Sequence, residues 1–287
     1  MANLKEIRNR ISSVSSTMQI TSAMKMVSAA KLKKAQDAVV AMRPYAEKLS
    51  FLLTGIGQNL DEGTQNAYAE KRAIKRVLIV AISSNRGLCG AFNTNIIKTV
   101  KSIANSYQDG VEVEVIALGK KAKDGLKSSL PISADYSSIF EQLSFESSSE
   151  IADKLIAGFL SEQYDEIRLV YNSFKNAATQ IVKNESFLPM IPEANSEGSD
   201  NEEYIFEPSA EDIVSELIPK SLKIQLYKAI RDSFASEHGA RMTAMHKATD
   251  NAKELRNQLK LTYNKARQAA ITNEILEIVG GAEALNG

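Results

Sequence analysis

The chain has 287 residues, and its 35 basic and 35 acidic side chains balance to a net charge of zero. Its single cysteine, Cys89, excludes an internal disulfide and is typical of a reducing compartment. The N-terminus is charged from Lys5 onward and lacks the apolar core of a secretory signal. The longest apolar run, residues 77–82, is far shorter than the ~20 residues that span a bilayer. The composition therefore predicts neither a disulfide-stabilised fold nor a membrane span.

Residues 1–57 have the apolar spacing of a long helix. Apolar side chains recur at alternating steps of three and four, and no glycine occurs before Gly55. The stripe comprises Leu4, Ile7, Ile11, Val14, Met18, Leu32, Ala35, Val39, Met42, Ala46, Leu49, Leu53 and Ile56. Pro44 lies within this pattern and should bend the helix or remove one hydrogen bond.

Polar residues interrupt this stripe in its middle. Thr21, Lys25 and Ser28 occupy the expected apolar positions, and Ile20, Met24 and Val27 lie one position earlier. We therefore expect the apolar stripe to rotate at this point.

The middle of the chain alternates strand and helix patterns. Strands are predicted at residues 73–82, 111–118, 166–174 and 179–191, and helices at 94–107, 120–128 and 147–163. This order predicts a small, mostly parallel sheet with right-handed crossovers, whose first strand is buried on both faces. Residues 195–203 are predicted to form an acidic mobile loop, and residues 204–206 an edge strand.

A second long helix is predicted at the C-terminus. Ser209 and Asp212 resemble a capping box that opens a short helix to Ile218, which Pro219 ends before the long helix begins. Residues 240–279 contain the apolar seam of this helix. The seam comprises Met245, Ala248, Ala252, Leu255, Leu259, Thr262, Ala266, Ala269 and Leu276.

Two long helices from opposite chain ends, each with a narrow apolar stripe, are most simply paired. We predict an α+α/β fold: a long antiparallel coiled coil of N- and C-terminal helices plus a small Rossmann-like α/β domain. The predicted boundaries are 1–57 for the N-terminal helix, 58–208 for the central α/β domain and 209–287 for the C-terminal helix. Residues 1–57 have nine basic and three acidic side chains, which favours an acidic partner around the stalk.

The sequence shows no catalytic constellation. The turn at residues 86–90 follows the first strand, where such folds bind phosphate, but it lacks the G-x-G-x-x-G pattern, so a structural turn is favoured. Cys89 has no histidine near it in sequence, and His238 and His246 are predicted to face the surface or a partner. We therefore predict no catalytic residue, no cofactor and no metal site. Positive charge is the only feature that favours nucleic acid as a partner, and no helix-turn-helix, zinc or RRM motif accompanies it, so we predict no nucleic-acid partner.

Four motifs together resemble one family. They are ITSAMKMVSAAKL at residues 20–32, NRGLCGAFN at 85–93, EHGARMTAMHKATDNA at 237–252 and ITNEILEIVGGA at 271–282. In this order they resemble the γ subunit of F-type ATP synthases, and the resemblance covers essentially the whole chain.

The resemblance implies a non-catalytic rotor shaft. In that family the coiled coil stands inside a ring of three α and three β subunits, and the α/β body binds the ε subunit and the c-ring. Rotation of the shaft couples proton flow to ATP synthesis or hydrolysis. The implied location is the cytoplasmic face of the bacterial inner membrane, where the chain would be peripheral.

The same resemblance implies a set of partner-contact residues. By position in the matching motifs these are Met24, Arg241, Gln268, Thr272 and Glu274, with Lys25 modulating the fit next to Met24. Without the resemblance, Met24 and Thr272 could be ordinary seam residues, and the other three could be solvated positions on a helix.

Two other functions remain open from the residues alone. One is a coiled-coil adaptor or chaperone with an α/β head. The other is a nucleotide-handling enzyme that uses the turn at residues 87–90.

Overall fold

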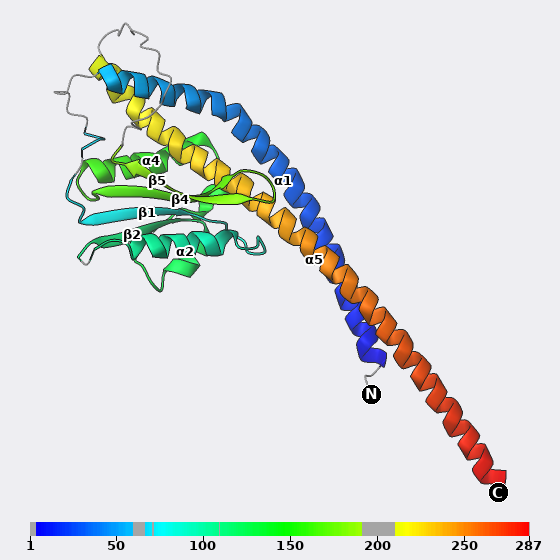
Figure 1. The fold of residues 1–287 in the computed structure, drawn as a ribbon. Coiled ribbons are helices and arrows are strands. Elements are labelled where there is room, and N and C mark those ends of the chain that lie inside the picture. The colour runs from blue at the N-terminus through cyan, green and yellow to red at the C-terminus, as the bar shows by residue number, and fades with distance from the viewer. Residues whose placement is uncertain (1–3, 60–66, 71, 109, 191–209, 287) are drawn as a thin grey trace. The chain divides into compact units, whose positions relative to one another are not determined.

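The computed structural model describes residues 4–59, 67–70, 72–108, 110–190 and 210–286 (Figure 1). Its contacts divide the chain into two units, Met1–Ser28 with Met242–Gly287, and Ala29–Arg241. We call them the helix-pair unit and the sheet unit. The helices α1 (Leu4–Asn59) and α5 (Ala210–Asn286) each contribute residues to both units. The predicted division at 58 and 208 remains a prediction.

The sheet unit contains five strands in the order β3-β2-β1-β4-β5. The strands are β1 (Arg76–Ile82), β2 (Glu112–Leu118), β3 (Ile132–Asp135), β4 (Glu166–Phe174) and β5 (Gln180–Leu188). Neighbouring strands pair in parallel except β4 with β5, which pair antiparallel. The predicted Rossmann-like sheet is therefore confirmed.

Helices cover both faces of this sheet, as Figure 1 shows. They are α2 (Phe92–Ala104), α3 (Lys120–Leu126) and α4 (Phe145–Leu160), with a short 3₁₀ helix η1 (Ser137–Phe140). Alternate residues of β1 enter two separate cores, one with α2 and α3 and one with α4 and part of α5. From Val77 to Ile82 every side chain is buried, as the continuous apolar run predicts.

Strand β3 was not predicted. It has only four residues, half of them exposed, and it lies at the edge of the sheet. Ser133 and Asp135 give it little strand propensity, so its position depends on pairing with β2.

The predicted helix end at Pro219 is wrong, because α5 continues through this residue. Proline removes one backbone hydrogen bond and its ring crowds the preceding turn. Its neighbours compensate, since Ile218, Leu222 and Leu226 are buried in the core on the sheet. Ser209 and residues 195–206, for which a cap, a loop and an edge strand were predicted, lie outside the described residues.

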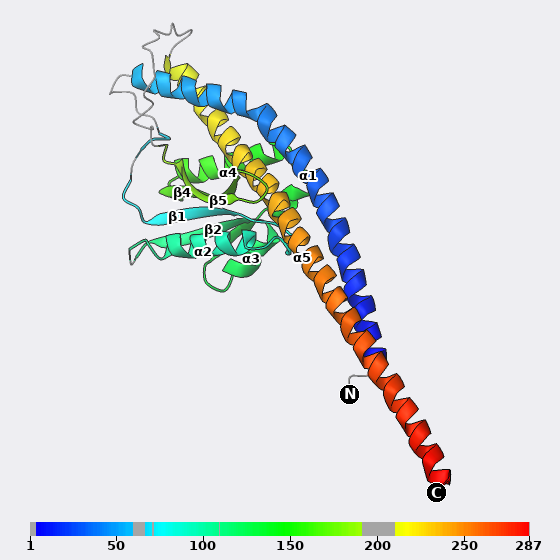
Figure 2. The same cartoon turned by 45° about the vertical axis from the view of Figure 1, so that its right-hand side comes forward.

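In the helix-pair unit, residues 4–28 of α1 lie antiparallel to α5 (Figures 1 and 2). A hydrogen bond of 2.8 Å joins Arg8 to Tyr263, and another of 2.8 Å joins Thr249 to Thr21. The predicted antiparallel pairing of the two ends of the chain is confirmed.

The predicted rotation of the α1 stripe is wrong. Thr21 and Ser28 are buried in the original register, whereas Ile20 and Val27 are about 60% exposed. The hydroxyl of Thr21 donates to the carbonyl of Met18, and that of Ser28 to the carbonyl of Met24. Because each hydroxyl is satisfied on its own helix, the polar residues remain in the seam at little cost.

The seam of α5 also differs from the prediction. Leu255 and Thr262 are exposed, and the next residues, Arg256 and Tyr263, are partly buried in their place. From Ala252, a step of three residues leads to Leu255 and a step of four to Arg256, and both steps occur in such seams. The apolar character of Leu255 therefore did not identify the residue that lies in the seam. From position 267 to 282 every side chain is exposed, including the predicted seam residues Ala269 and Leu276.

Candidate functional site

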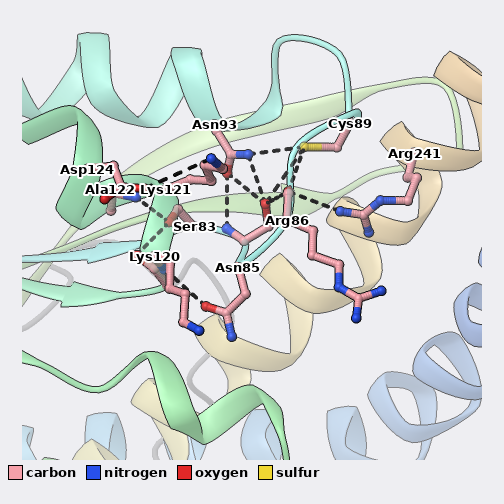
Figure 3. A network of polar contacts seen from close by, with 12 residues as sticks. Ser83, Asn85, Arg86, Cys89, Asn93, Lys120, Lys121, Ala122, Asp124 and Arg241 are labelled. Atoms are coloured by element: carbon pink, nitrogen blue, oxygen red, sulfur yellow. Dashed lines mark hydrogen bonds and ion pairs between the residues drawn. The ribbon is translucent and has the colours of Figure 1, made fainter.

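The turn after β1 is held by hydrogen bonds within the chain (Figure 3). The backbone N–H of Ser84 donates to Asn93 Oδ1 at 3.0 Å, and the Ser84 hydroxyl donates to the carbonyl of Arg86 at 2.6 Å. Leu88 and Gly90 both have φ near +60°, which gives the turn its tight path. The sulfur of Cys89 accepts from Asn93 Nδ2 at 3.2 Å.

A second set of bonds ties this turn to the start of α3. Asn85 Oδ1 accepts from the N–H of Lys120 at 3.0 Å, and Ser83 Oγ accepts from the N–H of Ala122 at 2.8 Å. Gly119 has a φ of +121°, and a Cβ there would lie 2.4 Å from the carbonyl oxygen of Ser83. Only glycine permits this close approach between the two turns.

These bonds use backbone N–H groups that a phosphate site would need. In a dinucleotide site, N–H groups at the helix start point at the phosphates. Here, the N–H of Ser84 in the turn after β1, and those of Lys120 and Ala122 at the start of α3, donate to side chains of the chain itself. The geometry favours the structural interpretation of the turn.

Arg241 of α5 lies against the same turn (Figure 3). Its Nη2 donates to the carbonyls of Arg86 and Gly87 at 3.2 and 3.3 Å, and its Nη1 forms an ion pair with Glu237. Arg241 is 7% exposed and Glu237 8%. The suggestion of a solvated helix position is therefore wrong for Arg241.

Burial also shifts the pKa values of Glu237 and His238. Burial raises the pKa of Glu237, whereas the positive charge of Arg241 lowers it. His238 is buried, and neither of its ring nitrogens is hydrogen-bonded. Its ring packs edge to face with that of Phe234, with the two ring centroids 4.5 Å apart. Burial, together with the charges of Arg241 and Lys31, lowers the pKa of His238 to about 4.

The surface placement predicted for His238 is wrong, because the helix turns it inward beside Phe234. His246 is exposed as predicted, and its Nδ1 lies 3.0 Å from Asp250.

Five of the six predicted contact residues lie in the helix-pair unit. Met24 and Lys25 are half-buried on α1, and Gln268, Thr272 and Glu274 are exposed on α5. The hydroxyl of Thr272 donates to the carbonyl of Gln268, so these two are adjacent on one face of the helix. Arg241 is the last residue of the sheet unit.

Comparisons with known proteins match the whole chain. The family model described as ATP synthase matches residues 3–285. The ATP synthase gamma chain of Flavobacterium johnsoniae is 67% identical over 287 residues, covering 100% of both chains. The chain belongs to the ATP synthase gamma chain family. The gamma chain of Geobacter metallireducens is 43% identical, again over 100% of both chains.

Solved structures are similar to this gamma-chain family member in fold. The central stalk and c-ring structure of Tetrahymena thermophila mitochondrial ATP synthase matches with a TM-score of 0.59 at 25% identity. That match covers 80% of this chain and 99% of that chain. A chain of the Euglena gracilis mitochondrial ATP synthase matches with a TM-score of 0.70 at 23% identity, covering 98% and 94%.

Sequence reasoning missed the apolar residues that this gamma-chain family member exposes. Five lie near the end of α5, namely Ile271, Ile275, Leu276, Ile278 and Val279, and each is at least 48% exposed. On α1, Ile20, Met26 and Val27 are also exposed, as are Val40 and Tyr45 farther along the helix. Thr21 and Ser28 could have revealed the α1 group, because they keep the spacing of the seam and so place Ile20 and Val27 outside it. Contiguous exposed apolar residues are typical of partner surfaces.

Proposed function

We propose that the chain is the central rotor shaft of an F1Fo ATP synthase. It transmits torque between the c-ring and the ring of three alpha and three beta subunits, and thereby couples proton flow to ATP synthesis or hydrolysis. The observation that carries this proposal is the full-length match to ATP synthase gamma chains. The Tetrahymena relative is described as part of a central stalk with a c-ring, which supports the same assembly here.

The helix-pair unit has the physical properties that a shaft requires. Two antiparallel helices joined side by side resist bending better than one, and their seam is narrow because it uses small residues such as Ala252 and Ala266. From position 267 to 282 the residues of α5 are exposed, and several are apolar. A surrounding ring of subunits would bury them.

The contact residues follow from this proposal. Met24 and Lys25 on α1, and Gln268, Thr272 and Glu274 on α5, would meet the alpha and beta subunits. Arg241 belongs to the same predicted set, although its guanidinium is engaged with Glu237 and the turn after β1. The α/β sheet would bind the epsilon subunit and the c-ring.

The chain would contribute no catalytic group, cofactor or metal to the complex. Two internal hydrogen bonds support this: the N–H of Ser84, in the turn after β1, donates to Asn93, and the N–H of Lys120, at the start of α3, donates to Asn85. Among the described residues, no helix has an apolar stretch that could cross a membrane. We place the chain at the cytoplasmic face of the bacterial inner membrane, attached through its partners.

Co-expression with the alpha and beta chains of the same organism tests the proposal. Purification through a tag on beta should recover three alpha, three beta and one copy of this chain, with ATP turnover that depends on its presence. Recovery of an active alpha–beta ring from which this chain is absent would contradict the proposal.

A further inference from the structure

A buried ion pair on α5 holds the turn after β1 by its backbone. Arg241 uses one guanidinium nitrogen on the Glu237 carboxylate and the other on the carbonyls of Arg86 and Gly87. Removing such a pair from water is costly unless further hydrogen bonds satisfy its remaining polar groups. The two carbonyls supply those bonds, so the pair and the turn depend on each other. Here we call Glu237, Arg241 and these two carbonyls the clamp.

The turn that the clamp holds is itself firmly attached to the sheet. Ser84 bonds to α2 and Asn85 to α3, and Asn172 of β4 donates to the carbonyl of Phe92 at 3.3 Å. A force applied to the sheet would therefore reach the carbonyls of Arg86 and Gly87 with little deformation of the turn.

A second set of contacts joins the same part of α5 to the sheet unit. A Cβ added to Gly239 would lie 3.2 Å from the carbonyl oxygen of Ala177, in the turn between β4 and β5. Ala240 packs with Cys89 and Phe92 in a small apolar cluster. Over residues 237–241, α5 is thus in contact with two different turns of the sheet unit.

We propose that Glu237 is a positioning residue for torque transmission. It orients and neutralises Arg241, which holds the turn after β1 onto α5, so that the sheet and this part of the shaft helix rotate as one body. This inference rests on the proposed rotor function. It assigns to Arg241 a role inside the chain, distinct from contact with a partner.

The test compares variants in the complete membrane complex. Glu237→Gln removes the charge that orients Arg241. We expect backbone hydrogen exchange in residues 84–90 to accelerate about tenfold and the protons pumped per ATP hydrolysed to fall several-fold. Glu216→Gln is the matched control, because it removes an exposed ion pair with the same spacing on the same helix. It should change neither quantity.

A charge exchange separates the clamp from a simple ion pair. Glu237→Arg combined with Arg241→Glu keeps opposite charges four residues apart. However, a carboxylate at position 241 cannot donate to the carbonyls of Arg86 and Gly87. We expect the exchanged variant to behave like Glu237→Gln. Arg241→Lys, which keeps a donor, should retain part of the coupling between ATP hydrolysis and proton pumping. Full recovery by the charge exchange would overturn the proposal.

A covalent link provides an independent readout. Ala240→Cys places a thiol in the cluster that contains Cys89, and oxidation should join the two. With this bond in place, the Glu237→Gln complex should regain normal coupling, and a reductant should abolish the gain. Loss of ATP turnover when the bond forms in the otherwise unchanged chain would show that the turn and α5 must move apart, which contradicts the clamp. Failure of the thiols to join would contradict the packing on which it is based.

These results are distinct from failure of the proposed function. If the unchanged chain neither assembles nor supports proton pumping, the rotor proposal is wrong. If it pumps normally and Glu237→Gln matches it in exchange and coupling, only the clamp is wrong.

Discussion

The sheet unit and the helix-pair unit bury their side chains to very different degrees. In the sheet unit, β1 is fully buried from Val77 onward, and even ionic groups such as Glu237 and Arg241 are enclosed. In the helix-pair unit, threonine and serine lie in the seam, while Ile20, Leu276 and other large apolar residues face outward. The sheet unit therefore has an extensive buried core. The helix-pair unit leaves apolar surface for partners to cover.

A large effect is expected at the packed turns of the sheet unit. Gly119→Ala should lower the free energy of unfolding by about 3 kcal/mol, because its Cβ would meet the Ser83 carbonyl at a strained φ. Gly87→Ala is the control, since no atom lies within 4 Å of the position that its Cβ would take. It should change the free energy by less than about 0.5 kcal/mol. Denaturant unfolding of the full chain measures both, and equal effects would contradict this account of the turn.

The buried histidine should make the sheet unit sensitive to acid. Because the pKa of His238 is lowered to about 4, the unfolded state binds its proton first as the pH falls. The stabilisation is complete above the unfolded pKa and declines toward pH 4. Arg241 and Lys31 are the charged groups that lower this pKa alongside burial. Between pH 7 and 5 the free energy of unfolding of the unchanged chain should fall by about 2 kcal/mol more than that of His238→Phe.

The control for this pH dependence is the exposed histidine. His246→Gln should unfold with the same pH dependence as the unchanged chain. If His238→Phe and the unchanged chain gave parallel curves of unfolding free energy against pH, the buried neutral histidine would not be the cause.

A smaller effect is expected in the polar seam. The hydroxyl of Thr249 lies 2.8 Å from both Thr21 Oγ1 and the carbonyl oxygen of Met245, and its single proton is donated to one of them at a time. A double-mutant cycle with Thr21→Val and Thr249→Val should give a coupling energy of about 1 kcal/mol. The double variant should be no less stable than the more stable of the two single variants. A coupling energy near zero would mean that the hydroxyl pair does not hold the helices together.

The smallest effect on stability is expected at the exposed end of α5. Leu276→Ser should change the free energy of unfolding by less than about 0.5 kcal/mol, since this side chain is 63% exposed. It should nevertheless weaken assembly with the alpha and beta subunits, measured by co-purification. By contrast, Ile230→Ser, at a fully buried position, should lower the free energy of unfolding by several kcal/mol. Normal assembly of Leu276→Ser would remove this residue from the contact surface.

The sequence predicts those features that depend on local pattern. The apolar run of β1 and the repeated spacing in α1 and α5 were sufficient for the sheet and the antiparallel pairing. Strand β3 and the continuation of α5 through Pro219 depend on tertiary packing, which overrides weak local preference. The register in the seam depended on whether Thr21 and Ser28 could satisfy their hydroxyls locally, which spacing does not reveal.

The candidate site was predictable only in part. The motif at residues 237–252 indicated Arg241 through a family resemblance, but its bonds to Arg86 and Gly87 join residues more than 150 positions apart. Glu237 and Gly239 gave no separate signal, because an acidic residue and a glycine on a helix have many ordinary explanations. The contact residues of the helix-pair unit remain predictions.

The most direct test of the rotor function is the observation of rotation. Lys98→Cys introduces an exposed thiol on α2 for a bead, and the native Cys89 is buried and should not react. In an immobilised complex with alpha and beta subunits, ATP should drive continuous rotation of the bead in one direction. A stationary bead in complexes that continue to hydrolyse ATP would contradict the central claim that this chain is the rotating shaft.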